Sequence, residues 1–116
     1  MQDFKKLKVW QESRELVKEI YKITEKFPMN EQYGITSQMR RAVTSISANI
    51  AEGCGKATQK EFRRFLVIAN GSNKEVENFL IISNDLGYVN GVQLGEISQR
   101  YEKIGKMLTS LIKRLR

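Results

Sequence analysis

The last quarter of the chain carries an uninterrupted heptad pattern, which restricts the possible folds more than any other feature. Seven apolar or aromatic residues follow one another there at alternating steps of three and four: Leu94, Ile97, Tyr101, Ile104, Leu108, Leu111 and Leu115. This spacing keeps one apolar stripe on the same side of a helix and is typical of left-handed helix packing. Such a stripe must be buried against other helices, so the pattern predicts a helical bundle.

Three earlier segments also show helical periodicity. In the first, one face contains Trp10, Val17, Ile20, Tyr21, Thr24 and Phe27, with Leu16 and Ile23 beside them. Pro28 ends this run because proline lacks the amide hydrogen that a helix needs. In the second, the residues that step by three and four are Ile35, Met39, Ala42, Ile46, Asn49 and Gly53, with Val43 and Ile50 alongside. We expect Gly53 and Gly55 to stop this helix in the left-handed conformation that glycine adopts at little cost.

The third helix begins after Thr58, which with Glu61 predicts a capping box. Its apolar face consists of Phe62, Phe65, Leu66, Ala69, Val76, Leu80 and Ser83, and it stops at Leu86-Gly87. Asn90-Gly91 is interpreted as a turn between helices, and no segment has the pattern of a strand. The sequence therefore predicts an all-α fold, an antiparallel up-down four-helix bundle, with residues 1–116 forming a single domain.

The residue types exclude several classes of protein. The chain has no His and a single Cys, Cys54, so disulfide frameworks, zinc fingers and imidazole chemistry are ruled out. No nucleophile with a base and no metal-ligand set is present, so we expect no enzyme, no cofactor and no metal. The N-terminus does not have the pattern of a signal peptide, and no apolar run approaches the ~20 residues that span a bilayer. We expect a soluble cytoplasmic protein that does not associate with a membrane.

Basic residues exceed acidic ones, which gives a net charge of +7. The excess is concentrated in residues 90–116, which hold six basic and two acidic residues. Such a field attracts polyanions such as nucleic acid. The alternative is that cations near a helix C-terminus complement its dipole and keep the protein soluble. On the first interpretation, the residues expected to contact nucleic acid are Lys103, Lys106, Lys113 and Arg114, followed by Arg63 and Arg64.

A polar seam runs along the second helix beside its apolar face, formed by Arg41, Ser45, Asn49 and Glu52. Arg41 and Glu52 are three turns apart, about 16 Å of helical rise, so they do not form an acid–base pair. We therefore expect the seam to be buried or half-buried and to fix helix or subunit pairing, with a ligand contact as the alternative.

In the third helix, Gly71 costs about 1 kcal/mol relative to alanine. Its expected reason is close approach of a neighbouring helix, and a kink is the alternative.

Several motifs together resemble one family. They are Phe4-x-x-Leu7-x-Val9-Trp10, Phe27-Pro28 with Glu31 and Tyr33-Gly34, Arg41-Ala42-x-x-Ser45-Ile46-x-x-Asn49-Ile50-Ala51-Glu52-Gly53, Phe62-x-x-Phe65-Leu66 and Leu86-Gly87-Tyr88. The chain is similar to the four helix bundle protein family, whose first members are encoded in intervening sequences of 23S ribosomal RNA genes. The fold also resembles the accessory variability protein of diversity-generating retroelements, which partners a reverse transcriptase and binds nucleic acid.

The resemblance implies a homopentameric ring of bundles with a basic surface and no established enzymatic activity. Two classes of function follow. One is a non-enzymatic oligomeric scaffold that binds RNA or DNA without sequence specificity and delivers a partner such as a nucleic-acid enzyme. The other is a protein–protein interaction module with no nucleic-acid role.

Overall fold

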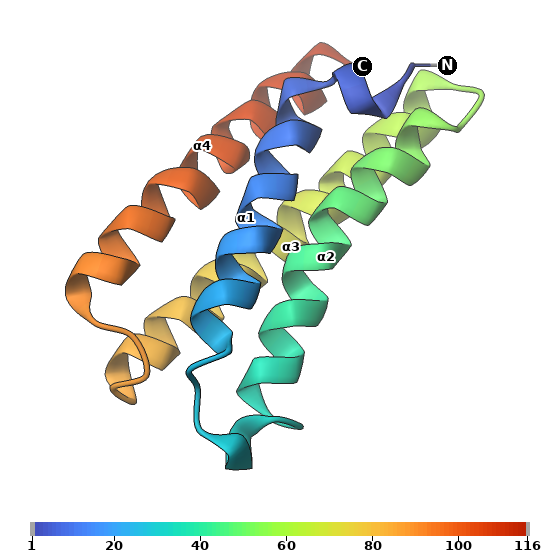
Figure 1. Cartoon of the computed structure of the whole chain (residues 1–116). Helices are drawn as coiled ribbons and strands as arrows, with labels where there is room; N and C mark the ends of the chain where they lie inside the picture. Colours follow the sequence, from blue (N-terminus) through green and yellow to red (C-terminus); the bar gives the residue numbers. More distant parts are fainter. Residues whose placement is uncertain (1, 116) are drawn as a thin grey trace.

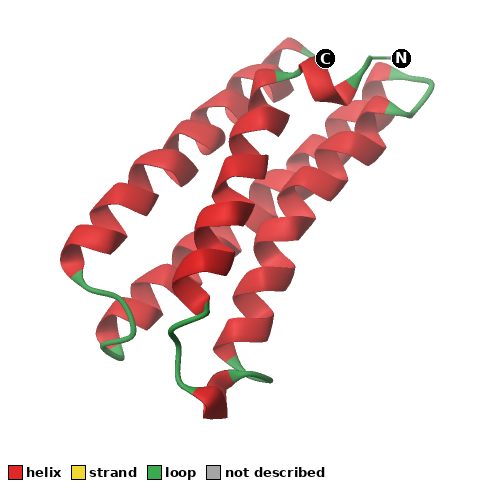
Figure 2. Cartoon of the chain, in the orientation of Figure 1, coloured by secondary structure: helices red, strands yellow, loops and turns green. Residues whose placement is uncertain are grey.

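The structure, a computed structural model, describes residues 2–115, and these form helices joined by loops, with no strand among them (Figure 2). The α-helices are α1 (Lys8–Thr24), α2 (Ile35–Cys54), α3 (Gln59–Asp85) and α4 (Gly91–Arg114). Short 3-10 turns, η1 (Phe4–Lys6) and η2 (Met29–Glu31), precede α1 and α2. The prediction of an all-helical fold with four helices is confirmed.

Each α-helix packs against the next one in the sequence, and α4 also packs against α1. The molecule is elongated, with extents of 43 × 24 × 20 Å. Both ends of the chain and the α2–α3 connection lie at one end, while the α1–α2 and α3–α4 connections lie at the other (Figure 1). The end of α4 therefore shares one end of the molecule with the start of α1 and the start of α3.

All four helices contribute side chains to one core. The fully buried large side chains are Leu16, Ile20, Met39, Val43, Ile46, Ile50, Leu66, Val76, Leu80, Ile104 and Leu108. On α1 the buried stripe passes through Val9, Leu16 and Ile20, whereas Tyr21 is 40% exposed. The expectation that Tyr21 belongs to the core face is wrong, because α2 and α4 both cover α1 from the side centred on Leu16. Tyr21 instead stacks under the guanidinium of Arg40, 4.5 Å from its ring centre.

The glycines near the end of α2 have a different role from the expected one. Gly53 lies inside the helix and is buried, and Gly55 caps it with φ −85°, so neither is left-handed. A Cβ at Gly53 would lie 2.9 Å from Cβ of Phe65 and 3.0 Å from Cδ1 of Phe62. Gly53 is required because α3 approaches α2 closely there.

The predicted capping box at the start of α3 forms only in part. The Thr58 hydroxyl accepts a hydrogen bond from the amide of Glu61 at 3.1 Å, but the Glu61 carboxylate pairs with Arg64. The complete reciprocal box lies at the start of α4, where Asn90 and Gln93 each bond the other's backbone amide. Asn90 therefore begins a helix as well as ending the turn.

The end of α3 follows the predicted stop at Leu86-Gly87. Gly87 has φ 79°, and the amides of Gly87 and Tyr88 donate to the carbonyls of Asn84 and Ser83, which is a Schellman motif. Tyr88 then reaches the α1–α2 connection, where its hydroxyl donates to Glu31 at 2.7 Å. The Leu86-Gly87-Tyr88 motif thus meets the motif that contains Glu31 at this end of the molecule.

The structure supplies neither of the two expected reasons for Gly71, which were the close approach of a neighbouring helix and a kink. It is exposed, a Cβ built on it meets nothing within 4 Å, and α3 runs without interruption from Gln59 to Asp85. Within the described chain, no neighbouring helix approaches Gly71.

Candidate nucleic-acid interface

The basic residues expected to contact nucleic acid lie on two helices that pack together. Arg63 and Arg64 lie near the start of α3, and the others lie in the second half of α4. These two segments share the end of the molecule where both chain ends lie (Figure 1). Arg63 connects them directly, because its Nε donates to the backbone oxygen of Ile112 at 3.3 Å.

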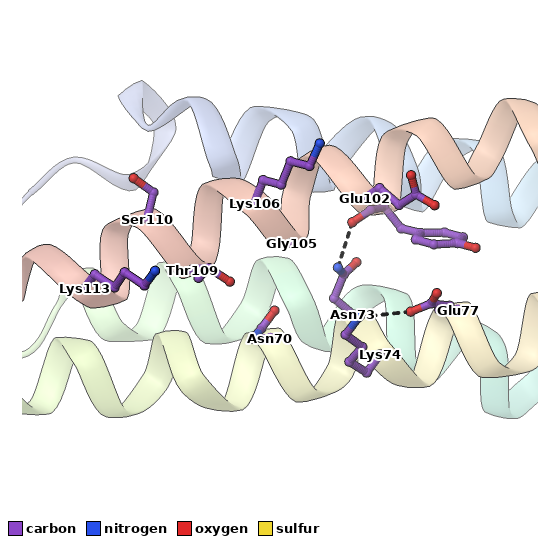
Figure 3. Close-up of a pocket in the computed structure, with 11 residues that line it drawn as sticks. Asn70, Asn73, Lys74, Glu77, Glu102, Gly105, Lys106, Thr109, Ser110 and Lys113 are labelled. Atoms are coloured by element: carbon purple, nitrogen blue, oxygen red, sulfur yellow. Dashed lines mark hydrogen bonds and ion pairs between the residues drawn. The ribbon is translucent and has the colours of Figure 1, made fainter.

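A groove of about 550 Å³ runs between α3 and α4. Its polar lining includes Asn70, Lys74, Lys106, Thr109, Ser110 and Lys113 (Figure 3). Lys74 is paired with Glu77 at 3.2 Å. Within residues 2–115, Lys106 and Lys113 take part in no ion pair. Glu77 and Glu102 also line the groove, but only Glu77 is ion-paired there, so the charges of Lys106 and Lys113 are not neutralised by an ion pair.

Asn73 lies deep in this groove and was not expected from the sequence. It is buried, and its Nδ2 donates to the backbone oxygen of Tyr101 at 2.8 Å (Figure 3). Its Oδ1 has no hydrogen-bond partner in the described chain. Gly105 allows the approach, since a Cβ there would lie 3.3 Å from Asn73 Nδ2. Asn73 thus holds α4 against α3, and its position between Ala69 and Val76 on the buried stripe was the signal that could have identified it.

A second groove, of about 400 Å³, lies between the start of α1 and the end of α4. Its lining includes Leu7, Lys8, Lys106, Ser110, Leu111 and Arg114. Lys106 borders both grooves, so the two flank the second half of α4. We call the four cations on these grooves that have no ion pair among residues 2–115 the basic ridge: Lys8, Lys106, Lys113 and Arg114.

Two of the expected residues already have acidic partners. Lys103 bonds Glu12 of α1 at 3.2 Å, on the side of α4 that faces α1. Arg64 pairs with Glu61 at 3.3 Å and lies over the ring of Phe65. The structure therefore brings Lys106, Lys113 and Arg114 together with Lys8, and does not bring Lys103 or Arg64 into the basic ridge.

Lys103 belongs to an ion-pair network between α1 and α4. Arg100 contacts two carboxylates of α1, with Nη1 at 2.7 Å from Glu12 and Nε bonded to Glu19. Glu12 is only 18% exposed and is shared by Arg100 and Lys103. The carboxylates of Glu12 and Glu19 therefore neutralise Arg100 and Lys103, so these two cations do not add to the basic surface.

The polar seam of α2 is shorter than expected. Asn49 Nδ2 donates to the backbone oxygen of Ser45 at 2.8 Å and to its Oγ at 3.0 Å. The Ser45 hydroxyl in turn bonds that of Ser72 on α3 at 2.9 Å. The hydrogen bonds thus link α2 to α3 through Ser72, a residue that the sequence interpretation did not include.

Arg41 and Glu52 lie outside this network. Both are exposed, and Glu52 has only a distant ion pair, 4.0 Å, with Lys56. The expectation of a buried seam extending to Glu52 is wrong for the single chain, because Glu52 is one residue before Gly53 and so points about 100° away from the buried stripe of α2. What the remaining Ser45–Asn49–Ser72 network contributes to stability stays a prediction.

Among residues 2–115, no group of three or more His, Cys, Asp or Glu is arranged to hold a metal ion. None of the helices described is long and apolar enough to pass through a membrane. Cys54 is buried at the end of α2, and burial raises the pKa of its thiol. The basic ridge is therefore the feature with the clearest ligand chemistry.

The fold and these surfaces define a small, all-helical protein with a basic end. Residues 5–110 match the family described as 23S rRNA-intervening sequence protein, and the chain belongs to this family. A crystal structure of a protein of unknown function from the S23 ribosomal protein family of Bacteroides thetaiotaomicron is similar, with 30% identity and a TM-score of 0.83. The match covers 90% of this chain and 98% of that one. No protein with a curated description matches the chain.

Proposed function

We propose that this protein is a non-enzymatic basic scaffold that binds the phosphate backbone of RNA or DNA without reading its sequence. The observation that carries the proposal is the basic ridge, whose four cations border two grooves and have no acidic partner among residues 2–115. Lysine, arginine and hydroxyl groups are the usual partners of phosphate oxygens, which position a protein on nucleic acid without specifying bases. Thr109 and Ser110 supply such hydroxyls next to Lys106 and Lys113.

We also propose that the bundle has the up-down order and that it assembles into a ring of five in the cytoplasm. The family membership supports this assembly through the resemblance described above. Five subunits at +7 would place 5 × 7 = +35 on one body. Several ridges on one assembly raise the effective concentration of binding sites along a strand, so weak contacts add up. A protein partner such as a nucleic-acid enzyme would then be carried to the bound strand.

The test is a titration of labelled duplex DNA and single-stranded RNA with the full chain over a series of salt concentrations. The parent should bind unrelated sequences with similar affinity near 0.1 M salt. In the Lys106→Gln/Lys113→Gln variant, the slope of log K against log salt should fall by about 0.9 for each duplex phosphate that the variant no longer neutralises. The matched control is Lys22→Gln/Lys26→Gln, which removes the same charge in and just after the last turn of α1, at the other end of the molecule, and should bind like the parent.

The alternative is the interaction module, and one observation favours it. Met29 in η2 and Tyr33 just after it are 83% and 89% exposed, so the single chain does not bury these large side chains. If the parent does not bind nucleic acid near 0.1 M salt, the basic ridge is a solubility feature and this alternative replaces the scaffold. Equal losses of affinity in the ridge variant and the control would show that net charge, and not the ridge, controls binding.

A further inference from the structure

A further groove, of about 410 Å³, lies at the end of the molecule opposite the basic ridge, beside the α1–α2 connection (Figure 1). Tyrosines, hydroxyl residues and arginines of α1, of the chain after η2 and of α2 line it, among them Tyr21, Tyr33, Thr36, Ser37, Arg40 and Arg41. We call it the tyrosine–arginine groove. None of the described residues that line it is acidic. The groove therefore combines aromatic rings with positive charge.

Arg40 is held in place by the end of α1. Its Nε donates to the buried hydroxyl of Thr24 at 2.9 Å, and its Nη2 donates to the backbone oxygen of Tyr21 at 3.3 Å. Its guanidinium also lies over the Tyr21 ring. Within residues 2–115, its Nη1 makes no hydrogen bond and Arg40 takes part in no ion pair. A guanidinium that is already ordered loses little freedom when it binds an anion.

Arg41 adds a second charge beside the start of α2. It is exposed and has no ion pair among residues 2–115. Ser37 lies four residues earlier, so the two side chains project from the same side of α2, one turn apart. The start of the helix is the positive end of its dipole, and there the Glu31 carboxylate reaches only the amide of Ile35, at 3.4 Å. This combination favours an anion.

Thr36 is an independent sign of a polar ligand. It is only 8% exposed and it lines the groove. Its hydroxyl has no hydrogen-bond partner within residues 2–115. Buried hydroxyls without a partner are rare in native proteins, because water or a ligand normally supplies one. A polar group in the groove would supply it here.

The two tyrosines give the groove an aromatic rim. Tyr33 is 89% exposed and Tyr21 is 40% exposed. Arg40 covers one face of Tyr21, whereas Tyr33 pairs with no ring or cation among the residues described. Exposed aromatic rings beside cations are the usual means of binding unpaired bases, since a ring stacks on a base while the cations contact phosphates.

We propose that the tyrosine–arginine groove binds a nucleotide of single-stranded RNA or DNA, with its base stacked on Tyr33 and a phosphate on Arg40 and Arg41. Every base has an aromatic face, so this contact does not select a sequence. In a duplex the bases are stacked on one another, so none is free to cover the Tyr33 ring. The groove thus adds a preference for single strands.

This inference rests on the proposed binding of nucleic acid, but it uses no residue of the basic ridge. Three labelled probes of equal length separate a stacked base from charge alone: a single strand of mixed sequence, the same strand without bases, and the duplex. The parent should bind the strand without bases at least about fivefold more weakly than the normal strand, which is the lower end of the effect of one stacked base.

Substitutions at Tyr33 show whether this ring carries the difference. Tyr33→Leu should bind the normal strand about fivefold more weakly than the parent does, and should bind the other two probes like the parent. Tyr33→Phe keeps the ring and should bind all three like the parent. The position is 89% exposed, so neither change should disturb the fold.

Arg41→Gln tests the phosphate contact. For the single strand, the slope of log K against log salt should fall by about 0.7, the value for one phosphate of a single strand. Lys22→Gln is the matched control, because Lys22 is an exposed cation in the last turn of α1 that does not line the groove. Its slope should equal that of the parent. A parental slope in Arg41→Gln would contradict the phosphate contact.

The results separate this proposal from the one for the basic ridge. If Lys106→Gln/Lys113→Gln binds like the parent while Tyr33→Leu loses affinity for the single strand alone, the groove binds nucleic acid and the ridge does not. If Tyr33→Leu binds all three probes like the parent, or weakens all three equally, no base stacks on Tyr33 and the groove proposal is wrong, whatever the ridge variant does. Displacement of the strand by adenosine monophosphate at the concentration of the strand itself would show a site for free nucleotides, which also contradicts it.

Discussion

Gly53 and Gly71 are both glycines inside helices, but only Gly53 is required by the fold of a single chain. Around Gly53, side-chain atoms of Phe62 and Phe65 occupy the space that a Cβ would need. Around Gly71 that space is open. The same residue type therefore has opposite consequences at the two positions, and substitution by alanine separates them.

We expect Gly53→Ala to lower the free energy of unfolding by about 1–3 kcal/mol, because α2 and α3 must move apart or repack. Gly71→Ala, the matched control, should raise it by about 0.5–1 kcal/mol, since alanine is the better helix former and meets no atoms. Urea denaturation in dilute solution measures both. A loss of stability in Gly71→Ala would contradict the open space that the structure shows there.

At the residue scale, the polar seam of α2 also divides in two: Asn49 is hydrogen-bonded to Ser45, whereas Glu52 is exposed. Asn49→Ala removes hydrogen bonds to Ser45 and should lower the free energy of unfolding by about 1 kcal/mol. Glu52→Ala removes only an exposed ion pair at 4.0 Å and should change it by less than about 0.5 kcal/mol. Equal effects in thermal or urea unfolding would show that Glu52 is covered by another subunit.

At the scale of the elements, one arginine makes two of the three ion pairs that join α1 and α4 within residues 2–115. Arg100→Met leaves Glu12 and Glu19 without their shared partner and should lower the free energy of unfolding by about 1–2 kcal/mol. The loss should shrink in high salt, because these side chains are partly exposed. Arg41→Met, at an exposed position with no ion pair within residues 2–115, is the control and should be neutral. A neutral Arg100→Met would mean that apolar packing alone holds α4 on α1.

The contact between Tyr88 and η2 should respond to alkaline pH. The hydrogen bond to Glu31 raises the pKa of Tyr88 in the folded state, with burial and the Glu31 charge as smaller causes. The neutral phenol is therefore favoured by folding, so this contribution is complete below the ordinary tyrosine pKa of about 10 and is lost as pH rises through the higher folded value.

Thermal unfolding from pH 8 to 11 tests this expectation. Over that range, the melting temperature of the parent should fall by more than that of Tyr88→Phe. Tyr33→Phe, at an 89% exposed tyrosine, should follow the parent. Parallel curves for the parent and Tyr88→Phe would mean that the hydrogen bond to Glu31 does not stabilise this end of the molecule.

At the scale of the whole molecule, the proposed ring makes a direct prediction of mass. A pentamer of this 13.4 kDa chain should give about 67 kDa in native mass spectrometry. Treatment with nuclease shows whether co-purifying RNA or DNA contributes to the mass. A 13.4 kDa species at micromolar concentration would contradict this assembly.

Local sequence was sufficient to predict the four helices, most residues of their apolar faces and the stop at Leu86-Gly87. Helical period, caps and glycine stops are local properties, so residues a few positions apart are enough to predict them. The heptad residues Ile97, Tyr101, Ile104 and Leu108 are buried as the pattern predicted. The candidate basic residues could also be named from the sequence, since the sequence gives the charge type and the position of each residue.

Which of those charges are free, and which polar residues meet, depends on tertiary packing. Lys103 is held by Glu12, 91 positions earlier, while Lys106 and Lys113 border an open groove. Asn73 reaches Tyr101, and Gly53 is packed against Phe65, because consecutive helices fold back and pack side by side. No local pattern contains such contacts, since they depend on how far each helix is rotated and how closely its neighbour approaches. The period of a helix is fixed by its own residues, but the partners of its side chains are fixed by the helices packed against it.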